Sequence, residues 1–225
     1  MGGLSFSIRP LDDIIAILVS FIIATAIHEF MHAWVAWQLG DDTARNQGRI
    51  TLNPASHFEP VGFFGMCMIA IGFPFIGWGK PVPVAPWRMS RIPRERRKLG
   101  LALVALAGPV SNIVQAAIAV IPIQIALRNG YDLGPVGEFL NWFVVINALL
   151  ASFNLIPIPP LDGFNILNGI LPDFWTPILE PLARYGFPIL LLLIFVGGRI
   201  VGSIFESMAY PLRDTLTDLL YRGLV

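Results

Sequence analysis

The sequence predicts an all-α polytopic membrane protein, a bundle of about four to six transmembrane helices with a small membrane-associated β-hairpin or sheet. Of its 225 residues, 55% are hydrophobic and only 13% are charged. A soluble domain typically carries about 25% charged residues. Several apolar runs also approach the ~20 residues that a helix needs to cross a bilayer. Because the formal net charge is zero, nothing in the composition indicates a nucleic-acid partner, and we expect none.

The first long apolar segment, residues 13–38, predicts a transmembrane helix. Because Arg9 precedes it, the amino terminus superficially resembles a signal peptide. It has no small-residue cleavage site, however, and the apolar run continues directly into "HEFMH" at residues 28–32. We therefore expect a first helix that is retained in the protein.

The second apolar segment, residues 60–78, is interrupted by helix-breaking residues: Gly62, Gly65, Gly72, Pro74 and Gly77. This pattern favours a chain that enters the membrane and returns over a regular span. The stretches on either side, "GRITLNP" and "GKPVPVAP", alternate small or apolar residues with polar residues or proline. That alternation predicts the β-hairpin.

The third segment, residues 99–127, follows a short basic stretch, "WRMSRIPRERRK". Six cationic residues stand there against a single glutamate: Arg88, Arg91, Arg94, Arg96, Arg97 and Lys98. Short loops rich in Lys and Arg remain in the cytoplasm, so the stretch is interpreted as a topology signal. Within the segment, "AGPVSN" contains Gly108, which permits close helix approach, and Asn112, which can hydrogen-bond across helices. Packing is the preferred role for both.

The fourth segment, residues 136–158, ends in "NLIPIPPLDGFN". Its prolines stop the helix, so we expect Asp162 on unwound backbone. A fifth segment covers residues 177–198, and the amphipathic stretch after it, broken near Pro211, is predicted to lie at the membrane interface. We expect one domain over residues 1–225, with a core at about 13–170 and C-terminal helices at about 177–225.

His28 and His32 stand four residues apart, so in a helix both side chains project from one face. This is the HExxH arrangement, in which two imidazoles bind zinc and the glutamate, here Glu29, takes a proton from the attacking water. The alternative is a pair of buried histidines satisfied by neighbouring polar groups. Three adjacent ionisable groups at membrane depth are costly and usually functional. We therefore favour a zinc site with one ion per chain.

A catalytic zinc site needs a third protein ligand and one open position. Cys67 is the only cysteine, which excludes a thiolate cluster. Since His57 is the only remaining histidine, an acidic third ligand is expected, and Asp162 is the candidate. Taken alone, the "DG" dipeptide would indicate merely a turn. In combination with HExxH, Asp162 becomes the preferred ligand.

Three motifs together resemble the site-2 proteases, the intramembrane zinc metalloproteases of peptidase family M50. These are HExxH in the first helix, "AGPVSN" in the third segment and "NLIPIPPLDG" at the end of the fourth, in the family's order over about residues 20–170. The resemblance implies zinc bound by His28, His32 and Asp162, with Glu29 as general base and acid. It also implies a minimal catalytic core, without a PDZ insertion or appended CBS domains.

The resemblance further implies a zinc metalloendopeptidase that cuts a peptide bond in or near the transmembrane helix of a membrane protein, as in regulated intramembrane proteolysis. The expected substrates are single-pass proteins such as anti-sigma factors or other membrane-tethered regulators, in a prokaryotic cytoplasmic membrane. Asn154 matches the family's asparagine that steadies the substrate carbonyl or its oxyanion; capping the broken helix end is the alternative. "GKPVPV" resembles the edge to which an unwound substrate adds by β-pairing.

Two other functions remain open at this point. A transporter or metal-binding protein without proteolytic activity would spread acidic and histidine residues through several helices. A zinc protease of another type would take its third ligand from a later glutamate, Glu180 or Glu206. His57 is interpreted as a surface structural residue, with contact to substrate as the alternative.

A shared ion also constrains the topology, because His28, His32 and Asp162 must lie at one depth. With the basic stretch in the cytoplasm, the fourth segment returns inward and places Asp162 in the cytoplasmic half. His28 matches that depth only if the first helix begins outside. His28 then lies about 15 Å from the cytoplasmic end of that helix. We therefore predict an external amino terminus and a second segment that does not cross.

Overall fold

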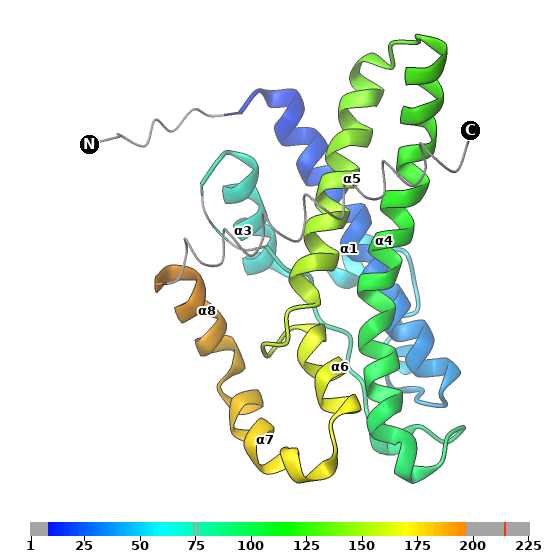
Figure 1. Ribbon diagram of the computed structural model, residues 1–225, viewed down its shortest axis with the longest axis vertical. Helices are drawn as coiled ribbons and strands as arrows, with labels where there is room; N and C mark the ends of the chain where they lie inside the picture. The colour runs from blue at the N-terminus through cyan, green and yellow to red at the C-terminus, as the bar shows by residue number, and fades with distance from the viewer. Residues whose placement is uncertain (1–8, 74, 76, 197–213, 215–225) are drawn as a thin grey trace.

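The computed structural model describes residues 9–73, 75, 77–196 and 214. Three helices in this part of the chain are long and apolar enough to cross a membrane: α1 (Leu11–Gln38), α4 (Arg97–Asn129) and α5 (Gly134–Asn154). Figure 1 shows α4 and α5 side by side along the long axis, with α1 crossing them. The protein is thus an all-α, multi-pass membrane protein, with three such spans among the described residues where four to six were expected.

Small side chains bring these helices together. α4 packs against α1, α5 and α6 (Asp162–Ile170), and alanines recur at the contacts: Ala24, Ala33, Ala36, Ala105, Ala116, Ala119, Ala148 and Ala151 are all buried. Small residues let backbones approach closely in lipid, where van der Waals packing replaces the hydrophobic effect as the driving force between helices. The close approach of α1 and α4 brings His28 and His32 of α1 into contact with α4.

The second apolar segment returns, as predicted. After α2 (Thr43–Asn46) and η1 (Pro54–His57), α3 (Pro60–Ala70) has 11 residues and is about 16 Å long, well short of a ~30 Å hydrocarbon core. The chain turns at Gly72, with a positive φ of 105°, and runs back beside α3. A Cβ added to Gly62 of α3 would collide with the carbonyl oxygen of Trp78 in the returning chain.

The predicted β-hairpin is wrong: within the described residues the structure contains no strand. Prolines at 81, 83 and 86 have no N–H and cannot donate to a ladder. Two of the remaining donors go to acidic side chains, Val82 N–H to Glu29 and Ala85 N–H to Asp41, and Lys80 N–H goes to the His57 carbonyl. The two stretches do meet, but mainly through the side chain of Arg49 on the backbone of residues 80 and 81.

The basic stretch lies at the C-terminal end of α1 and leads into α4 through the short helices η2 (Pro86–Arg88) and η3 (Arg94–Arg96). The Arg91 backbone N–H donates to the Leu39 carbonyl, and the Arg91 side chain donates to the Gln38 carbonyl. One end of the bundle therefore combines the end of α1, the start of α4 and the positive charge.

The fourth and fifth segments differ in detail from expectation. α5 ends at Asn154, and after the irregular residues 155–161, Asp162 is the first residue of α6 rather than part of an unwound stretch. The fifth segment is divided into α7 (Thr176–Arg184) and α8 (Gly186–Val196), preceded by η4 (Asp173–Trp175). In Figure 1, α7 and α8 form an arm beside α6. Apart from Asp214, the predicted amphipathic segment after residue 198 lies outside the described residues.

Candidate metal centre

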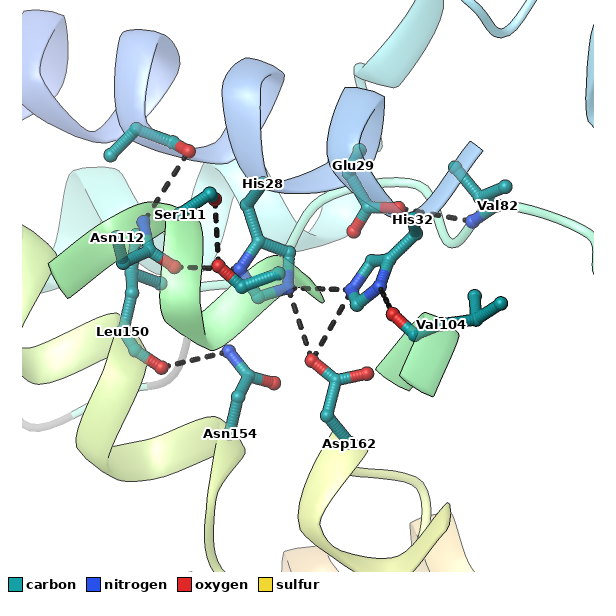
Figure 2. Close-up of polar contacts among 12 residues, drawn as sticks. His28, Glu29, His32, Val82, Val104, Ser111, Asn112, Leu150, Asn154 and Asp162 are labelled. Carbon is teal, nitrogen blue, oxygen red and sulfur yellow. Dashed lines mark hydrogen bonds and ion pairs between the residues drawn. The ribbon is translucent and has the colours of Figure 1, made fainter. Parts of the chain in front are cut away.

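His28, His32 and Asp162 converge at one point between α1, α4 and α6 (Figure 2). The Asp162 Oδ2 atom lies 3.2 Å from His28 Nε2 and 3.3 Å from His32 Nε2. The two Nε2 atoms are 2.9 Å apart. Both histidines are buried, at 6% and 7% exposure. Helical spacing supplies the histidine pair, and the first turn of α6 supplies the carboxylate.

The opposite nitrogens of the two rings are held by oxygen acceptors. His28 Nδ1 lies 2.6 Å from the Asn112 side-chain oxygen, and His32 Nδ1 lies 2.7 Å from the Val104 carbonyl oxygen. Neither oxygen carries a proton, so each Nδ1 must be the donor. In a neutral imidazole the other nitrogen is then an acceptor, so both Nε2 lone pairs face the same point.

The donor set fits a divalent metal ion. Two imidazole lone pairs and a carboxylate oxygen face one another without a proton to share, and Asp162 Oδ2 is buried with no hydrogen-bond donor. The backbone also leaves space beside them: a Cβ added to Gly108 would lie 2.5 Å from His28 Nε2 and closer still to His32 Nε2. Zinc binds imidazole nitrogen at about 2.0–2.1 Å, and catalytic zinc takes three protein ligands.

Two asparagine side chains support the Nδ1 side of the His28 ring. The Asn112 amide nitrogen donates to the Asn147 side-chain oxygen at 2.8 Å, and the Asn147 amide nitrogen donates to the Phe143 carbonyl at 2.9 Å. Asn112 and Asn147 are fully buried, at 0% exposure. Partners of this kind fix the ring orientation and tautomer of a metal-binding histidine.

Of the two alternative zinc ligands, only Glu180 lies among the described residues, and it does not belong to this cluster. Glu180 is exposed on α7, and Glu206 lies outside the described residues. Within the part of the chain that the structure describes, the His28, His32 and Asp162 group is the only one with metal-binding spacing. In the three candidate spans of the described residues, the buried ionisable side chains are His28, Glu29 and His32, which gather at one site and do not form the distributed path that a transporter predicts.

Comparison with known proteins identifies similar sequences and a matching protein family. The sequence pattern described as "Peptidase family M50" matches residues 120–197. Over 197 residues the chain is 36% identical to a Bacillus subtilis protein named "Putative zinc metalloprotease YwhC", covering 85% of this chain and 84% of the relative. A Mycolicibacterium smegmatis relative of the same description, Rip2, is 30% identical over 192 residues, 84% of this chain and 71% of its own length.

The chain belongs to peptidase family M50. A relative from Methanocaldococcus jannaschii, MJ0611, is 29% identical over 186 residues, 78% of this chain and 82% of the relative, and carries the same description. Among solved structures, none matches. The protein is a zinc metalloendopeptidase of the membrane, and its cofactor is Zn²⁺.

The remaining residues predicted for this M50 protein surround a cavity of about 640 Å³. Glu29 is 8% exposed, lines the cavity, and accepts the Val82 N–H through Oε2 at 3.0 Å. Asn154 also lines it, at the last turn of α5, where its amide nitrogen donates to the Leu150 carbonyl at 2.9 Å (Figure 2). Apolar walls come from Trp78, Val82, Val84, Phe187 and Leu190.

Sequence reasoning missed three contributors to this M50 site. Asn147 stands in an apolar helix with no motif around it, and its contact with Asn112 shows its role. Asn112 and Gly108 were assigned to packing, but Asn112 also holds His28, and Gly108 leaves the space beside His28 and His32 that a Cβ would fill. His57, expected at the surface, is buried at 3% exposure. The signal that the sequence offered for Asn147 was a polar amide inside an apolar membrane helix.

Proposed function

We propose that this protease hydrolyses a peptide bond in or near the transmembrane helix of a membrane protein, with His28, His32 and Asp162 as zinc ligands. The observation that carries the proposal is the convergence of these three groups within 3.3 Å between α1, α4 and α6, of which α1 and α4 are long and apolar enough to span a membrane. We assign the catalytic core to about residues 13–170 of a single domain.

The three ligands leave an open position for the reaction. The chemistry that zinc supplies in such a site is Lewis-acid chemistry, which polarises a carbonyl and makes water acidic near neutral pH. The protein's own contribution is to hold two imidazoles and a carboxylate in fixed orientation, and Asn112 and the Val104 carbonyl do this for the histidines.

Glu29 is the general base in this proposal. It follows His28 on α1, so its carboxylate lies beside the ligand pair and lines the same cavity. With Oε2 held by the Val82 N–H, Oε1 can accept a proton from the attacking water. Glu29 then delivers that proton to the leaving amine, which is the usual cycle of a general acid–base group.

Asn154 is the candidate for steadying the substrate carbonyl or its oxyanion. It lines the cavity, and one of its two N–H groups is bound to the Leu150 carbonyl. The second N–H is available to donate, since a primary amide carries two. A donor directed at the developing oxyanion would stabilise the transition state.

The substrate helix must unwind before it can be cut, because a helix keeps its carbonyl groups in internal hydrogen bonds. The apolar cavity walls suit an unwound, membrane-derived segment, and helix-destabilising residues in the substrate should favour cleavage. We place the reaction in the cytoplasmic membrane of a prokaryote and the substrates among single-pass regulators such as anti-sigma factors. Bacterial relatives described as zinc metalloproteases support that location.

The decisive experiment captures substrates with Glu29→Gln. In native membranes this variant should retain zinc and accumulate uncut single-pass proteins that the wild type cleaves, identified by mass spectrometry after cross-linking. Glu138→Gln, at an exposed position on α5, is the matched control and should cleave normally. Full turnover by Glu29→Gln would refute the assignment of the base.

Zinc content tests the third ligand separately. Purified Asp162→Ala should lose most of its zinc, because two imidazoles alone hold the ion weakly. Glu180→Ala is the comparison, since Glu180 was the competing carboxylate and lies exposed on α7. If zinc stays in Asp162→Ala and leaves in Glu180→Ala, the ligand set is wrong.

A further inference from the structure

Arg49 is a buried arginine outside the membrane helices. The residue as a whole is only 5% exposed. Nη1 donates to the Pro81 carbonyl at 3.2 Å, and Nη2 donates to the Lys80 carbonyl at 2.5 Å. The guanidinium therefore binds two consecutive carbonyls of the segment 79–85. A planar fork of fixed donors suits such a pair, which a lysine ammonium cannot match.

His57 holds the same guanidinium from another side. Its Nε2 lies 2.8 Å from the Thr51 carbonyl oxygen, so Nε2 carries the proton and Nδ1 is the acceptor. Arg49 Nη2 lies 3.3 Å from that Nδ1. The His57 carbonyl in turn accepts the Lys80 N–H at 2.9 Å. Arg49 and His57 thus fix the Lys80–Pro81 backbone through three hydrogen bonds, to the two carbonyls and from the Lys80 N–H.

Val82 follows Pro81, and its N–H donates to the Glu29 carboxylate at 3.0 Å. Residues 81 and 83 are prolines, so Val82 has the only N–H in that stretch. Further along, the Ala85 N–H is held by Asp41 Oδ2 at 2.6 Å. The segment is fixed on both sides of the one donor that binds Glu29.

Charge also connects Arg49 with Glu29. Burial lowers the pKa of the Arg49 guanidinium, and the nearby Glu29 carboxylate opposes that change. The guanidinium nevertheless remains charged. The Arg49 side chain donates to carbonyl and imidazole acceptors and, among the described residues, not to a carboxylate. Glu29 therefore has a nearby positive charge and keeps an oxygen for proton transfer.

We propose that Arg49 is a positioning residue for the catalytic base: it holds the Lys80–Pro81 backbone so that the Val82 N–H orients the Glu29 carboxylate. This inference rests on the proposed role of Glu29. It assigns a function to the "GRITLNP" stretch, which contains no residue that touches the metal ligands. The consequence is that a loop residue distant from the zinc site in sequence sets the turnover rate without setting metal affinity.

The first test measures the segment itself by hydrogen–deuterium exchange on the full-length, zinc-loaded protein in detergent. Arg49→Ala should speed exchange in peptides covering residues 79–85, because the two carbonyl contacts are lost. The matched control is Arg45→Ala, whose exposed guanidinium pairs with Asp42 at the surface, and it should leave that segment unchanged. Unchanged exchange in Arg49→Ala would overturn the proposal.

The second test measures turnover with a quenched peptide carrying the transmembrane helix of a protein captured by Glu29→Gln. Arg49→Ala should lose about 10- to 100-fold in kcat while KM changes by less than about twofold, because the base and not the substrate is displaced. Zinc stoichiometry should remain that of the wild type. Arg49→Lys should recover little, because it cannot bind both carbonyls. Wild-type kcat, or loss of zinc, in Arg49→Ala would contradict a positioning role.

A double-mutant cycle separates positioning from a general structural role. Val82→Pro removes the N–H that Arg49 is proposed to place. In that background, adding Arg49→Ala should lower kcat by less than about twofold, whereas independent effects would multiply. Multiplied losses would show that Arg49 acts elsewhere. If Glu29→Gln itself turns over normally, the proposed function has failed; if it is inactive and Arg49→Ala is normal, only this inference has failed.

Discussion

At the scale of single residues, the site depends on which atoms of each side chain are already occupied. The Nδ1 atoms of His28 and His32 are bound by oxygen acceptors, so their Nε2 atoms are presented as lone pairs. Gly108 leaves room for what those lone pairs bind. Metal affinity should therefore respond to residues that never contact the ion.

Gly108→Ala should abolish most zinc binding while the bundle still folds. Its methyl group would press on both Nε2 atoms, where α1 and α4 are in close contact and cannot separate cheaply. Zinc stoichiometry by elemental analysis measures the effect. Gly137→Ala on α5, where the nearest contact is a Leu133 side-chain atom at 3.0 Å, is the control. Normal zinc content in Gly108→Ala would contradict the assignment of the site.

Asn112→Ala should weaken zinc binding by about 10- to 100-fold, the usual effect of removing a group that orients a ligand. It frees His28 Nδ1 and also leaves the buried Asn147 oxygen without its donor. Competition with a metal chelator measures the affinity. Val114→Ala, at a half-exposed position on the same helix, should bind zinc normally. Equal affinities for the two variants would show that His28 needs no support.

At the scale of elements, α3 and the returning chain act as one unit beside the site. α3 packs on α1 and α5 through Met66 and Ala70, in a core that includes Phe21 and Ile146. The chain that returns along α3 continues as the segment that reaches Glu29. A disturbance between α3 and this return should therefore reach the cavity.

Gly62→Ala should destabilise the protein by about 1–3 kcal/mol, the typical cost of overpacking. The added methyl would meet backbone, the Trp78 carbonyl, which cannot rotate away as a side chain can. Thermal unfolding in detergent provides the measurement. Val61→Ala, at an exposed position one residue earlier, should change stability by less than about 0.5 kcal/mol. A melting temperature equal to wild type in Gly62→Ala would argue against this close approach.

At the scale of the whole molecule, the positive charge of residues 88–98 gathers at one end of the bundle. The end of α1 and the start of α4 meet at the basic stretch, and the turn between α4 and α5, residues 130–133, lies at the other end of α4. If the positive charge is retained in the cytoplasm, we expect the start of α1 outside. We then expect the proposed zinc ligands in the cytoplasmic half, because His28 is ten residues from the end of α1, about 15 Å.

A compartment-sensitive reporter tests this orientation. Fused after residue 3, it should give an external signal, as should a fusion in the turn at residues 130–133. A fusion within the basic stretch should report the cytoplasm. A cytoplasmic signal from the first fusion, with the others as expected, would overturn the topology.

Local sequence patterns predicted much of this protein. Spacing of four residues placed His28 and His32 on one face, and the proline-rich stretch directed attention to Asp162. Glycine and proline content predicted that residues 60–78 return. The β-hairpin prediction failed because the alternating pattern does not reveal where backbone donors go, and here two of them, from Val82 and Ala85, go to Glu29 and Asp41.

The sequence by itself determined the membrane class, the helical segments and the two motifs that carry the proposed ligands, because these follow from local composition and from periodicity along one helix. Only the tertiary structure decided that Asn147 supports Asn112, that His57 is buried, and that Arg49 holds the chain beside Glu29. Such contacts join residues far apart in sequence. They arise from close helix packing and from the need of every buried polar group for a partner, and neither condition is visible in a one-dimensional pattern.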